Sequence, residues 1–282
     1  MIRSNSLRAI ILAALVGLLA YFALSRPAIP GLPGTPRINP PAGLPPSGSP
    51  QVGVSPLAGG HERDNRVLGE FDLARIYPDR VLRQGDVKQN LVALTFDDGP
   101  DTQFTPQILD ALAQKGVRAT FFLIGKRLSE APAVVGRIIA EGHAVGNHTY
   151  NHPNVMRFTA DEISSEIASA GEALRRFGVR RTDMFRPPYG AVHVSSVESL
   201  ANSGYRLYLW SVDSLDWRGL NSQQVIDNVV PLVANGSVIL MHSAGGPGED
   251  LSGTVQALPV IIDQLRAKGY RFVTLTEMFP VR

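Results

Sequence analysis

The sequence predicts a parallel α/β fold and favours a (β/α) barrel of seven or eight strands over an open doubly wound sheet. Seven short apolar strands alternate with helices from residue 91 onward, which is the pattern of parallel β/α units. No G-x-G-x-x-G follows the first strand, so the dinucleotide-binding form of the open sheet lacks its phosphate loop. Polar side chains directly follow several strands, and a barrel brings such positions to one face.

The first two β/α units have clear boundaries. A strand is predicted at 91–96, where an apolar run ends on two aspartates. The helix at 105–115 has a proline at its first position and a glycine past its end. The next strand is predicted at 119–124, and a glycine ends the following helix at 132–141.

The later elements follow the same alternation. The helix at 159–177 opens with Thr and Glu in capping-box spacing. The other predicted helices are 195–203, 222–233 and 254–268. The remaining predicted strands are 144–146, 184–186, 205–212, 237–241 and 271–275.

Composition excludes several kinds of site. The 282 residues include no cysteine, so any metal must be held by His, Asp or Glu. The formal net charge is +2, but residues 1–58 hold four of the 27 Lys and Arg residues and none of the 25 Asp and Glu residues. The remainder has no basic excess, so we expect no nucleic-acid partner.

The N-terminal region is expected to attach the chain to a membrane. Residues 9–25 form an uncharged apolar run behind Arg3 and Arg8, at the lower limit of length for a transmembrane helix. A secretory signal peptide has the same layout, but no A-x-A cleavage site follows. We therefore expect residues 1–26 to be a single-pass anchor in the cell membrane. The rest would lie outside the cytoplasm, and would be secreted if this segment were cleaved.

The remainder divides into three parts by composition. Residues 27–58 include ten prolines and five glycines, which indicates a semi-extended linker. Residues 59–89 are expected to be a lead-in segment that packs on the domain, with no assigned function. Residues 90–282 are expected to form the main domain.

Two adjacent carboxylates, Asp97 and Asp98, end the first strand in TFDDGPD. Like charges this close raise each other's pKa unless a positive group lies beside them. The two interpretations are a helix cap with a spare charge and a metal site. His148 and His152 in HTYNH are spaced to bind one ion from a tight loop, although such a pair also occurs in polar surface loops. With Asp98 they form a His-His-Asp set typical of catalytic metal sites, and Asp97 stays free to move a proton.

Three further segments are ambiguous when taken singly. Arg186 in FRPPYG either stands exposed in a rigid turn or forks onto Asp97 and orients it. Trp217 in DSLDW either packs in the core or faces a sugar. His242 ends an apolar strand, where a hydrogen-bonded structural histidine is the alternative.

Together, these segments resemble the polysaccharide deacetylases of carbohydrate esterase family 4, also called the NodB homology domain. The resemblance extends from about residue 90 to residue 279 and includes TFDDGPD, GNHTYNH, FRPPYG, WSVDSLDW and LMH in the family's order. It implies a distorted (β/α) barrel and a hydrolase that removes acetyl groups from a glycan.

The resemblance also implies catalytic roles. Asp97 would be the general base and His242 the general acid. Arg186 would position Asp97. Asp216 would orient His242, with Asp213 as the alternative for that role.

Metal and substrate residues follow from the same resemblance. The implied ligands of a divalent metal, most often zinc with cobalt as an alternative, are Asp98, His148 and His152. Tyr189 would offer its backbone N–H to the oxyanion. Trp217 and Leu240 would line the pocket for the sugar and the acetyl group. Ser243 departs from the family, because many members have an acid at that position.

The expected function is metal-dependent hydrolysis of N-acetyl groups on amino sugars of an extracytoplasmic glycan. Peptidoglycan N-acetylglucosamine is the first expected substrate. Chitin-type oligosaccharides, exopolysaccharides and O-acetylated polysaccharides are alternatives. A wall-binding pseudoenzyme is the non-catalytic alternative, but it should have lost the base or a ligand. The catalytic domain is expected to be monomeric.

Overall fold

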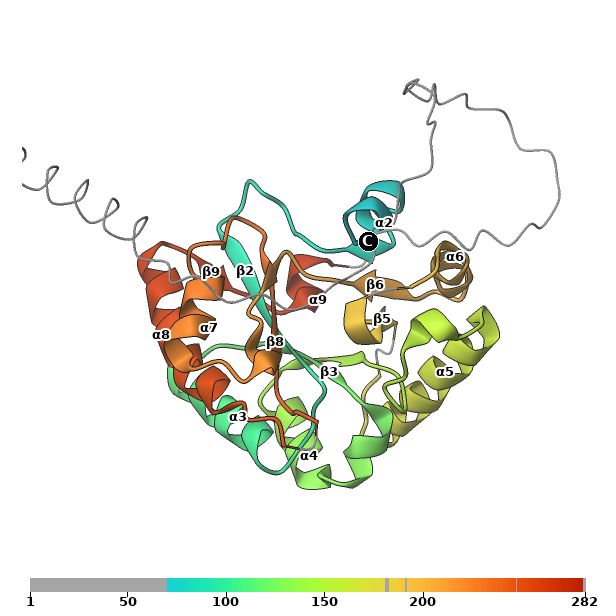
Figure 1. Ribbon diagram of the computed structural model, residues 1–282, viewed down its shortest axis with the longest axis horizontal. Helices are drawn as coiled ribbons and strands as arrows, with labels where there is room; N and C mark the ends of the chain where they lie inside the picture. The colour runs from blue at the N-terminus through green and yellow to red at the C-terminus, as the bar shows by residue number, and fades with distance from the viewer. Residues whose placement is uncertain (1–69, 181–182, 191, 247, 281–282) are drawn as a thin grey trace, which may run out of the picture. The chain divides into compact units, whose positions relative to one another are not determined.

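A curved sheet of parallel strands, a half-barrel, forms the centre of the protein and carries helices on its outer face (Figure 1). This computed structural model describes residues 70–180, 183–190, 192–246 and 248–280. The predicted anchor and linker lie outside these residues and stay predictions. Within the described ranges, no helix combines the length and the apolar character needed to cross a membrane.

Within the described residues the sheet has nine strands, two more than predicted. Eight of them are paired in the order β1-β6-β5-β4-β3-β2-β8-β7, and β9 pairs with the start of β2. β1 lies in the segment expected to be a lead-in, and it pairs with β6. The strands are β1 (Val81–Leu82), β2 (Leu91–Asp97), β3 (Thr120–Leu123), β4 (Ala144–Asn147), β5 (Met184–Phe185), β6 (Arg206–Tyr208), β7 (Val212–Asp213), β8 (Val238–His242) and β9 (Arg271–Phe272).

The strand predicted at 205–212 is in fact two strands at opposite ends of the pairing order. β6 lies between β1 and β5, whereas β7 pairs with β8. Between them the Leu209 N–H donates to the Leu82 carbonyl at 2.8 Å, and the Ser211 N–H donates to the Val238 carbonyl at 2.9 Å. The chain therefore crosses the open side of the half-barrel, which a continuous apolar run in the sequence does not reveal.

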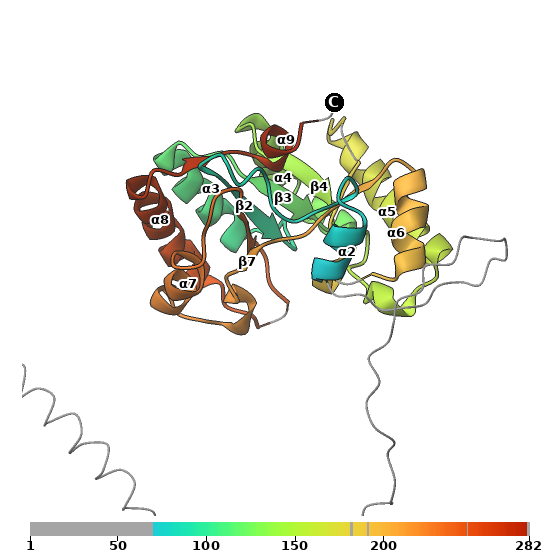
Figure 2. The ribbon, with the colours of Figure 1, turned by 90° about the horizontal axis from the view of Figure 1, so that it is seen from above.

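The helices follow one another around the sheet, from α8 and α7 through α3 and α4 to α5 and α6 (Figures 1 and 2). All six predicted helices are present, with ends shifted by at most four residues, and α2 and α9 were not predicted. The helices are α2 (Glu70–Ile76), α3 (Phe104–Lys115), α4 (Pro132–Ala140), α5 (Ala160–Arg176), α6 (Val194–Asn202), α7 (Ser222–Val229), α8 (Ser252–Ala267) and α9 (Leu275–Met278).

Local chemistry explains the differences in boundaries. α3 begins before Pro106 because the Asp101 carboxylate accepts the backbone N–H groups at its start. α7 ends early because Pro231, directly after Val230, has no backbone N–H to continue the helical hydrogen bonds. The predicted strand at 271–275 was too long: Thr274 forms a capping box with Glu277 and starts α9 instead.

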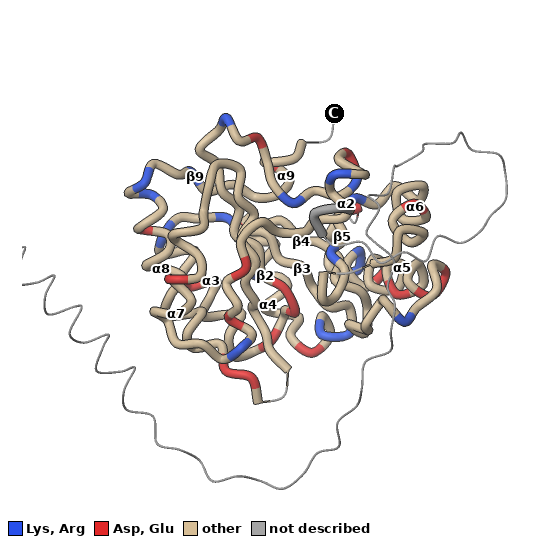
Figure 3. Tube along the Cα trace, turned by 45° about the horizontal axis from the view of Figure 1, so that its top comes forward, with Lys and Arg blue, Asp and Glu red and all other residues tan. Residues whose placement is uncertain are grey.

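The two faces of β2 separate core from site. Leu94 and Phe96 are fully buried in the core cluster shared with α3, α4, α7 and α8. Ala93 belongs to a smaller cluster on the inner side of the half-barrel. Because side chains alternate along a strand, Thr95 and Asp97 share the inner phase of Ala93. Lys and Arg are interspersed with Asp and Glu along the described chain (Figure 3).

Candidate active site

A cleft of about 640 Å³ lies at the carboxyl ends of the strands. The sequence predicted ten site residues, and eight of them line this cleft. They are Asp97, Asp98, His148, His152, Tyr189, Trp217, Leu240 and His242. The other two, Arg186 and Asp216, are almost fully buried and contact Asp97 and His242 respectively. The expectation that these residues gather on one face is therefore confirmed.

Three side chains converge at one end of the cleft. One ligand atom each of Asp98, His148 and His152 lies within 4.8 Å of the others. The Asp98 Oδ1 atom is 3.3 Å from His148 Nε2 and 3.1 Å from His152 Nε2. Asp98 follows β2, whereas both histidines come from the loop after β4.

The protonation pattern of this cluster fits a bound cation. The Nδ1 atom of His148 is 2.8 Å from the Arg186 carbonyl, which can only accept, so Nδ1 carries the proton of the neutral ring. His148 Nε2 then faces Asp98, and either a proton or a cation can lie between the two atoms. Burial lowers the pKa of His148, but the Asp97 and Asp98 carboxylates outweigh burial and raise it. Burial raises the pKa of the Asp98 carboxyl, but His148 and His152 outweigh burial and hold this pKa well below its usual value. The Asp98 Oδ1 atom is buried without a hydrogen-bond partner among the described residues, as expected of an atom placed for a metal ion.

Asp97 is held by a buried arginine. Arg186 Nη1 donates to Asp97 Oδ1 at 2.7 Å and to Thr95 Oγ1 at 2.8 Å. The sequence predicted two parallel hydrogen bonds from Arg186 to Asp97. In the structure the hydrogen bonds of Arg186 are instead divided between Asp97, Thr95 and two backbone carbonyls. Arg186 Nε and Nη2 donate to the carbonyls of Tyr208 and Leu209, at 2.8 and 3.2 Å. Arg186 thus joins Asp97 to the end of β6.

His242 is paired with Asp216 and not with Asp213. His242 Nδ1 lies 2.7 Å from Asp216 Oδ1, and Asp216 Oδ2 accepts the backbone N–H of His242 at 2.9 Å and the Thr254 hydroxyl at 2.8 Å. Asp213 instead accepts the Leu215 N–H at 2.8 Å. The geometry therefore selects between the two acids that the sequence left open.

The Asp216 contact sets the charge of His242. Burial lowers the pKa of His242, but the neighbouring Asp216 carboxylate outweighs it and raises this pKa to about 9. Burial also raises the pKa of Asp216, but the charge and hydrogen bonds of His242 hold it below its usual value. His242 is therefore a protonated imidazole at neutral pH and can donate a proton from Nε2.

Two large aromatic side chains stand exposed at the cleft. Tyr189 is 67% exposed and Trp217 is 48% exposed, which is unusual for side chains of this size. The Tyr189 ring centroid lies 5.1 Å from that of His152. Leu240 of β8 is nearly buried in the cleft wall. This combination of aromatic faces and a small apolar wall suits a sugar that carries an acetyl group.

Arg127 is a site residue that sequence reasoning missed. Its Nη1 donates to the Asp98 carbonyl at 2.9 Å and its Nη2 to the Gly245 carbonyl at 3.0 Å, which links the loops after β2 and β8. Arg127 lies outside the motifs, and its two partners are 29 and 118 residues away along the chain, so no local pattern marks it. At the unusual position after His242, the Ser243 N–H and hydroxyl both contact the Asp97 carbonyl, at 2.9 and 3.3 Å.

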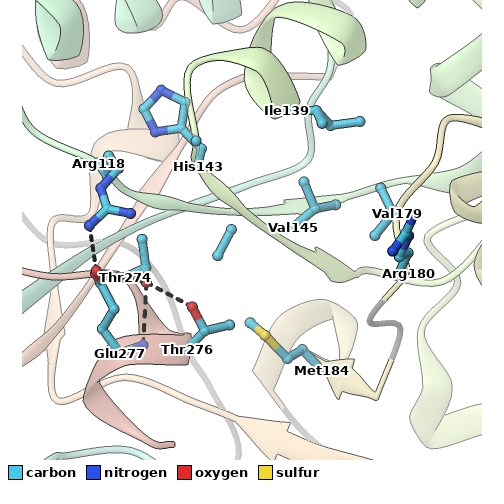
Figure 4. A pocket seen from close by; sticks show the side chains of 12 residues that line it. Arg118, Ile139, His143, Val145, Val179, Arg180, Met184, Thr274, Thr276 and Glu277 are labelled. Carbon is cyan, nitrogen blue, oxygen red and sulfur yellow. Dashed lines mark hydrogen bonds and ion pairs between the residues drawn. The ribbon is translucent and has the colours of Figure 1, made fainter.

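A second cavity, of about 270 Å³, lies near the amino ends of β4 and β5 and contains none of the predicted site residues (Figure 4). Arg118 is paired there with Glu277, and the ring of His143 is buried beside them. In Figure 4 Arg180 lies on the opposite side of the cavity from the Arg118–Glu277 pair, so the charged groups do not converge on a common point. The cleft at the carboxyl ends is therefore the candidate active site.

Comparison with known proteins identifies the family of this chain. The family model described as polysaccharide deacetylase matches residues 84–208. A peptidoglycan-N-acetylglucosamine deacetylase of Bacillus cereus is 46% identical over 188 residues, covering 67% of this chain and 68% of that protein. A chitooligosaccharide deacetylase of Bradyrhizobium is 34% identical over 204 residues, covering 69% of this chain and 93% of that protein. The crystal structure of the peptidoglycan N-acetylglucosamine deacetylase Bc1960 superposes with a TM-score of 0.71 at 41% identity, covering 74% of this chain and 97% of that one.

Proposed function

The chain belongs to the polysaccharide deacetylase family of hydrolases, and we propose that it removes N-acetyl groups from peptidoglycan N-acetylglucosamine. The observation that carries this proposal is that one cleft brings three groups together. They are the His-His-Asp cluster, Asp97 in its ion pair with Arg186, and His242 in its ion pair with Asp216. The name of the Bacillus cereus relative, 46% identical, supports the choice of substrate.

Asp97 is the proposed general base. Its Oδ1 atom is held by Arg186, and its Oδ2 atom lies 3.7 Å from His148 Nε2, on the side of the metal cluster. The Asp97 carboxylate can take a proton from a water molecule in the cleft. Asp97 then has a fixed orientation while it receives that proton.

His242 is the proposed general acid. Its raised pKa keeps the ring protonated, and the Asp216 hydrogen bond on Nδ1 leaves the Nε2 proton for transfer. The leaving amine of the sugar would receive this proton as the amide bond breaks. The Tyr189 backbone N–H is the proposed oxyanion donor, and Trp217 and Leu240 are the proposed contacts for the sugar ring and the acetyl methyl group.

Asp98, His148 and His152 would hold the divalent metal on which this family depends. We propose zinc, because two imidazoles and one carboxylate with open positions are typical of catalytic zinc sites. A bound cation supplies Lewis acidity, which polarises the acetyl carbonyl and lowers the pKa of water. Cobalt is the alternative metal.

A chitin-type oligosaccharide is the second candidate substrate. It is supported by the chitooligosaccharide deacetylase that is 34% identical. The apolar run at 9–25 and the proline-rich linker support attachment to the cell membrane, with a monomeric domain working on the wall outside. In that location peptidoglycan is the nearer glycan.

The test is release of acetate by the purified full-length chain from a panel of glycans. The panel contains peptidoglycan, chitooligosaccharides and an O-acetylated polysaccharide, each with added zinc and with a chelator. We expect the highest rate on peptidoglycan, new free amines on glucosamine, and loss of activity with the chelator. Faster acetate release from chitooligosaccharides than from peptidoglycan would make chitooligosaccharides the substrate. Equal rates with zinc and with the chelator would reject the role of the metal.

A further inference from the structure

The loop that carries both histidines of the metal cluster has a strained backbone. Thr149 has φ 67° and His152 has φ 60°, the left-handed region that side chains other than glycine rarely adopt. Such residues are strained and persist only when neighbouring structure holds them. The position of His152 therefore depends on contacts outside the loop.

One side of the loop is held by backbone groups of the short 3-10 helix η1 (Gly125–Ser129). The Gly125 N–H donates to the Thr149 carbonyl at 2.9 Å, and the Lys126 N–H donates to the Tyr150 carbonyl at 3.0 Å. Within the loop, Thr149 Oγ1 accepts the His152 N–H at 3.0 Å. These bonds satisfy the carbonyls of Thr149 and Tyr150 but leave the N–H groups of Tyr150 and Asn151 to be satisfied elsewhere.

The other side is held by a single carboxylate from α5. Glu166 Oε2 accepts the N–H groups of Tyr150 and Asn151, at 3.0 and 2.8 Å. Glu166 Oε1 accepts the side-chain amide of Asn151 at 2.8 Å. Both carboxylate oxygens are thus used on the two residues between Thr149 and His152, and hydrogen bonds to a charged acceptor are the stronger kind.

We propose that Glu166 is a positioning residue that fixes the 149–152 loop in its metal-binding conformation. The proposal rests on the metal-dependent function above. His152 Nε2 lies 3.1 Å from Asp98 Oδ1, a placement that requires the left-handed backbone at His152. Without Glu166, the two N–H groups would turn to water and the loop would relax toward ordinary backbone angles. Binding a metal would then include the cost of ordering the loop again.

The experiment measures the zinc dissociation constant of the full-length chain by competition with a chromophoric chelator. Glu166→Ala should weaken zinc binding by about tenfold or more, the effect typical of residues that orient metal ligands. Glu166→Gln should restore most of the affinity, because one amide oxygen can accept both N–H groups and Asn151 can rotate its own amide. Glu172→Ala is the matched control, because Glu172 lies on the same helix and pairs with Arg175 and Arg176 of that helix.

A second readout separates positioning from general stability. The visible spectrum of the cobalt-loaded chain reports ligand geometry, and we expect it to change in Glu166→Ala and not in Glu172→Ala. Should Glu166→Ala fail to fold, Glu166→Asp keeps the charge but withdraws the oxygens, and it should weaken zinc binding as well. Unchanged zinc affinity and an unchanged cobalt spectrum in folded Glu166→Ala, or in Glu166→Asp where Glu166→Ala does not fold, would overturn the inference. The proposed function would instead be overturned if the wild-type chain bound no zinc, or if the His152→Ala variant bound zinc as tightly as the wild type.

Discussion

The two edges of the sheet make left-handed turns with different residues. At the amino-terminal edge, where helices return to strands, left-handed positions are occupied by glycine, at Gly116, Gly142, Gly178, Gly204 and Gly269. At the cleft edge, left-handed glycines such as Gly190 are joined by residues that have side chains, at Asp98, Thr149, His152, Tyr189 and Leu215. Glycine adopts this conformation at little steric cost, whereas other residues are strained there. The strain is concentrated where side chains are needed for the site.

Charged groups differ between the edges in the same way. The Arg118–Glu277 pair of the amino-terminal edge is largely exposed, with side chains 55% and 38% accessible. The Arg186–Asp97 pair at the cleft edge is 0% and 5% accessible. Burying two charges costs several kcal/mol of hydration, and this cost is offset only by close contacts and full hydrogen bonding. The comparison indicates that strained backbone and buried charge are concentrated at the cleft edge, where the site uses them.

The largest expected effect tests the cleft edge directly. Asp97→Asn removes the proposed base and should lower the rate of acetate release by about 10²–10⁴-fold. Bound zinc, measured by elemental analysis, should be unchanged, because Asp98 and the two histidines remain. Asp110→Asn on the outer side of α3 is the matched control and should keep the full rate. Loss of zinc from Asp97→Asn would move Asp97 from base to ligand.

Stability should separate the two arginines. Arg186→Met leaves Asp97 charged and buried without its partner, and it should lower the free energy of unfolding by about 3–5 kcal/mol. Arg118→Met breaks an exposed pair and should change it by about 0–1 kcal/mol. Chemical denaturation of the two variants makes the comparison. Equal losses would show that the two edges do not differ in this respect.

The pH profile should report the Asp216–His242 pair. The pKa of His242 is raised to about 9 from 6.5, so deacetylation should fall as the pH rises through about 9 and the acid loses its proton. Asp216→Asn removes the charge that raises this pKa, so the alkaline limb of kcat/KM should move to lower pH. A profile unchanged by Asp216→Asn would assign the limb to another group.

The same pair makes stability depend on pH. Because the folded pKa of His242 is raised, its contribution to stability is present below 6.5 and is lost as the pH rises through about 9. The pKa of Asp216 is lowered from 3.8, so its contribution is present above 3.8 and is lost in more acidic solution. The thermal unfolding temperatures of the wild type and of Asp216→Asn should therefore differ most between pH 3.8 and pH 6.5, where both contributions are present.

The smallest expected effect is the change in stability when a glycine is replaced by alanine, and it tests whether glycine is needed for left-handed backbone. A Cβ added at Gly116 meets no atom within 4 Å, so Gly116→Ala tests backbone conformation alone and should destabilise by about 1–2 kcal/mol. Gly136 lies inside α4 and is equally unobstructed, so Gly136→Ala should stabilise by about 0.5–1 kcal/mol. Opposite signs in urea denaturation would establish the conformational cause, and equal signs would contradict it.

Sequence reasoning was strongest where signals are local. The capping box at Thr159, the Pro132 start of α4 and the apolar β2 strand all appear as predicted. It failed at Tyr208 and Val212, where one apolar run is divided between two strands that pair at different ends of the sheet. Strand pairing depends on partners far along the chain, and hydrophobicity alone does not specify them.

The amino-acid sequence by itself determined the parallel α/β class, the family and the identity of the cleft residues. These follow from short motifs, whose residue types and spacing are written in the chain. Only the tertiary structure decided that Asp216 and not Asp213 contacts His242, that Arg186 spreads its bonds beyond Asp97, and that Arg127 and Glu166 support the site. The physical reason is that these hydrogen bonds form between groups brought together by packing. The position of a residue in the sequence does not specify how far it lies from its partner in space.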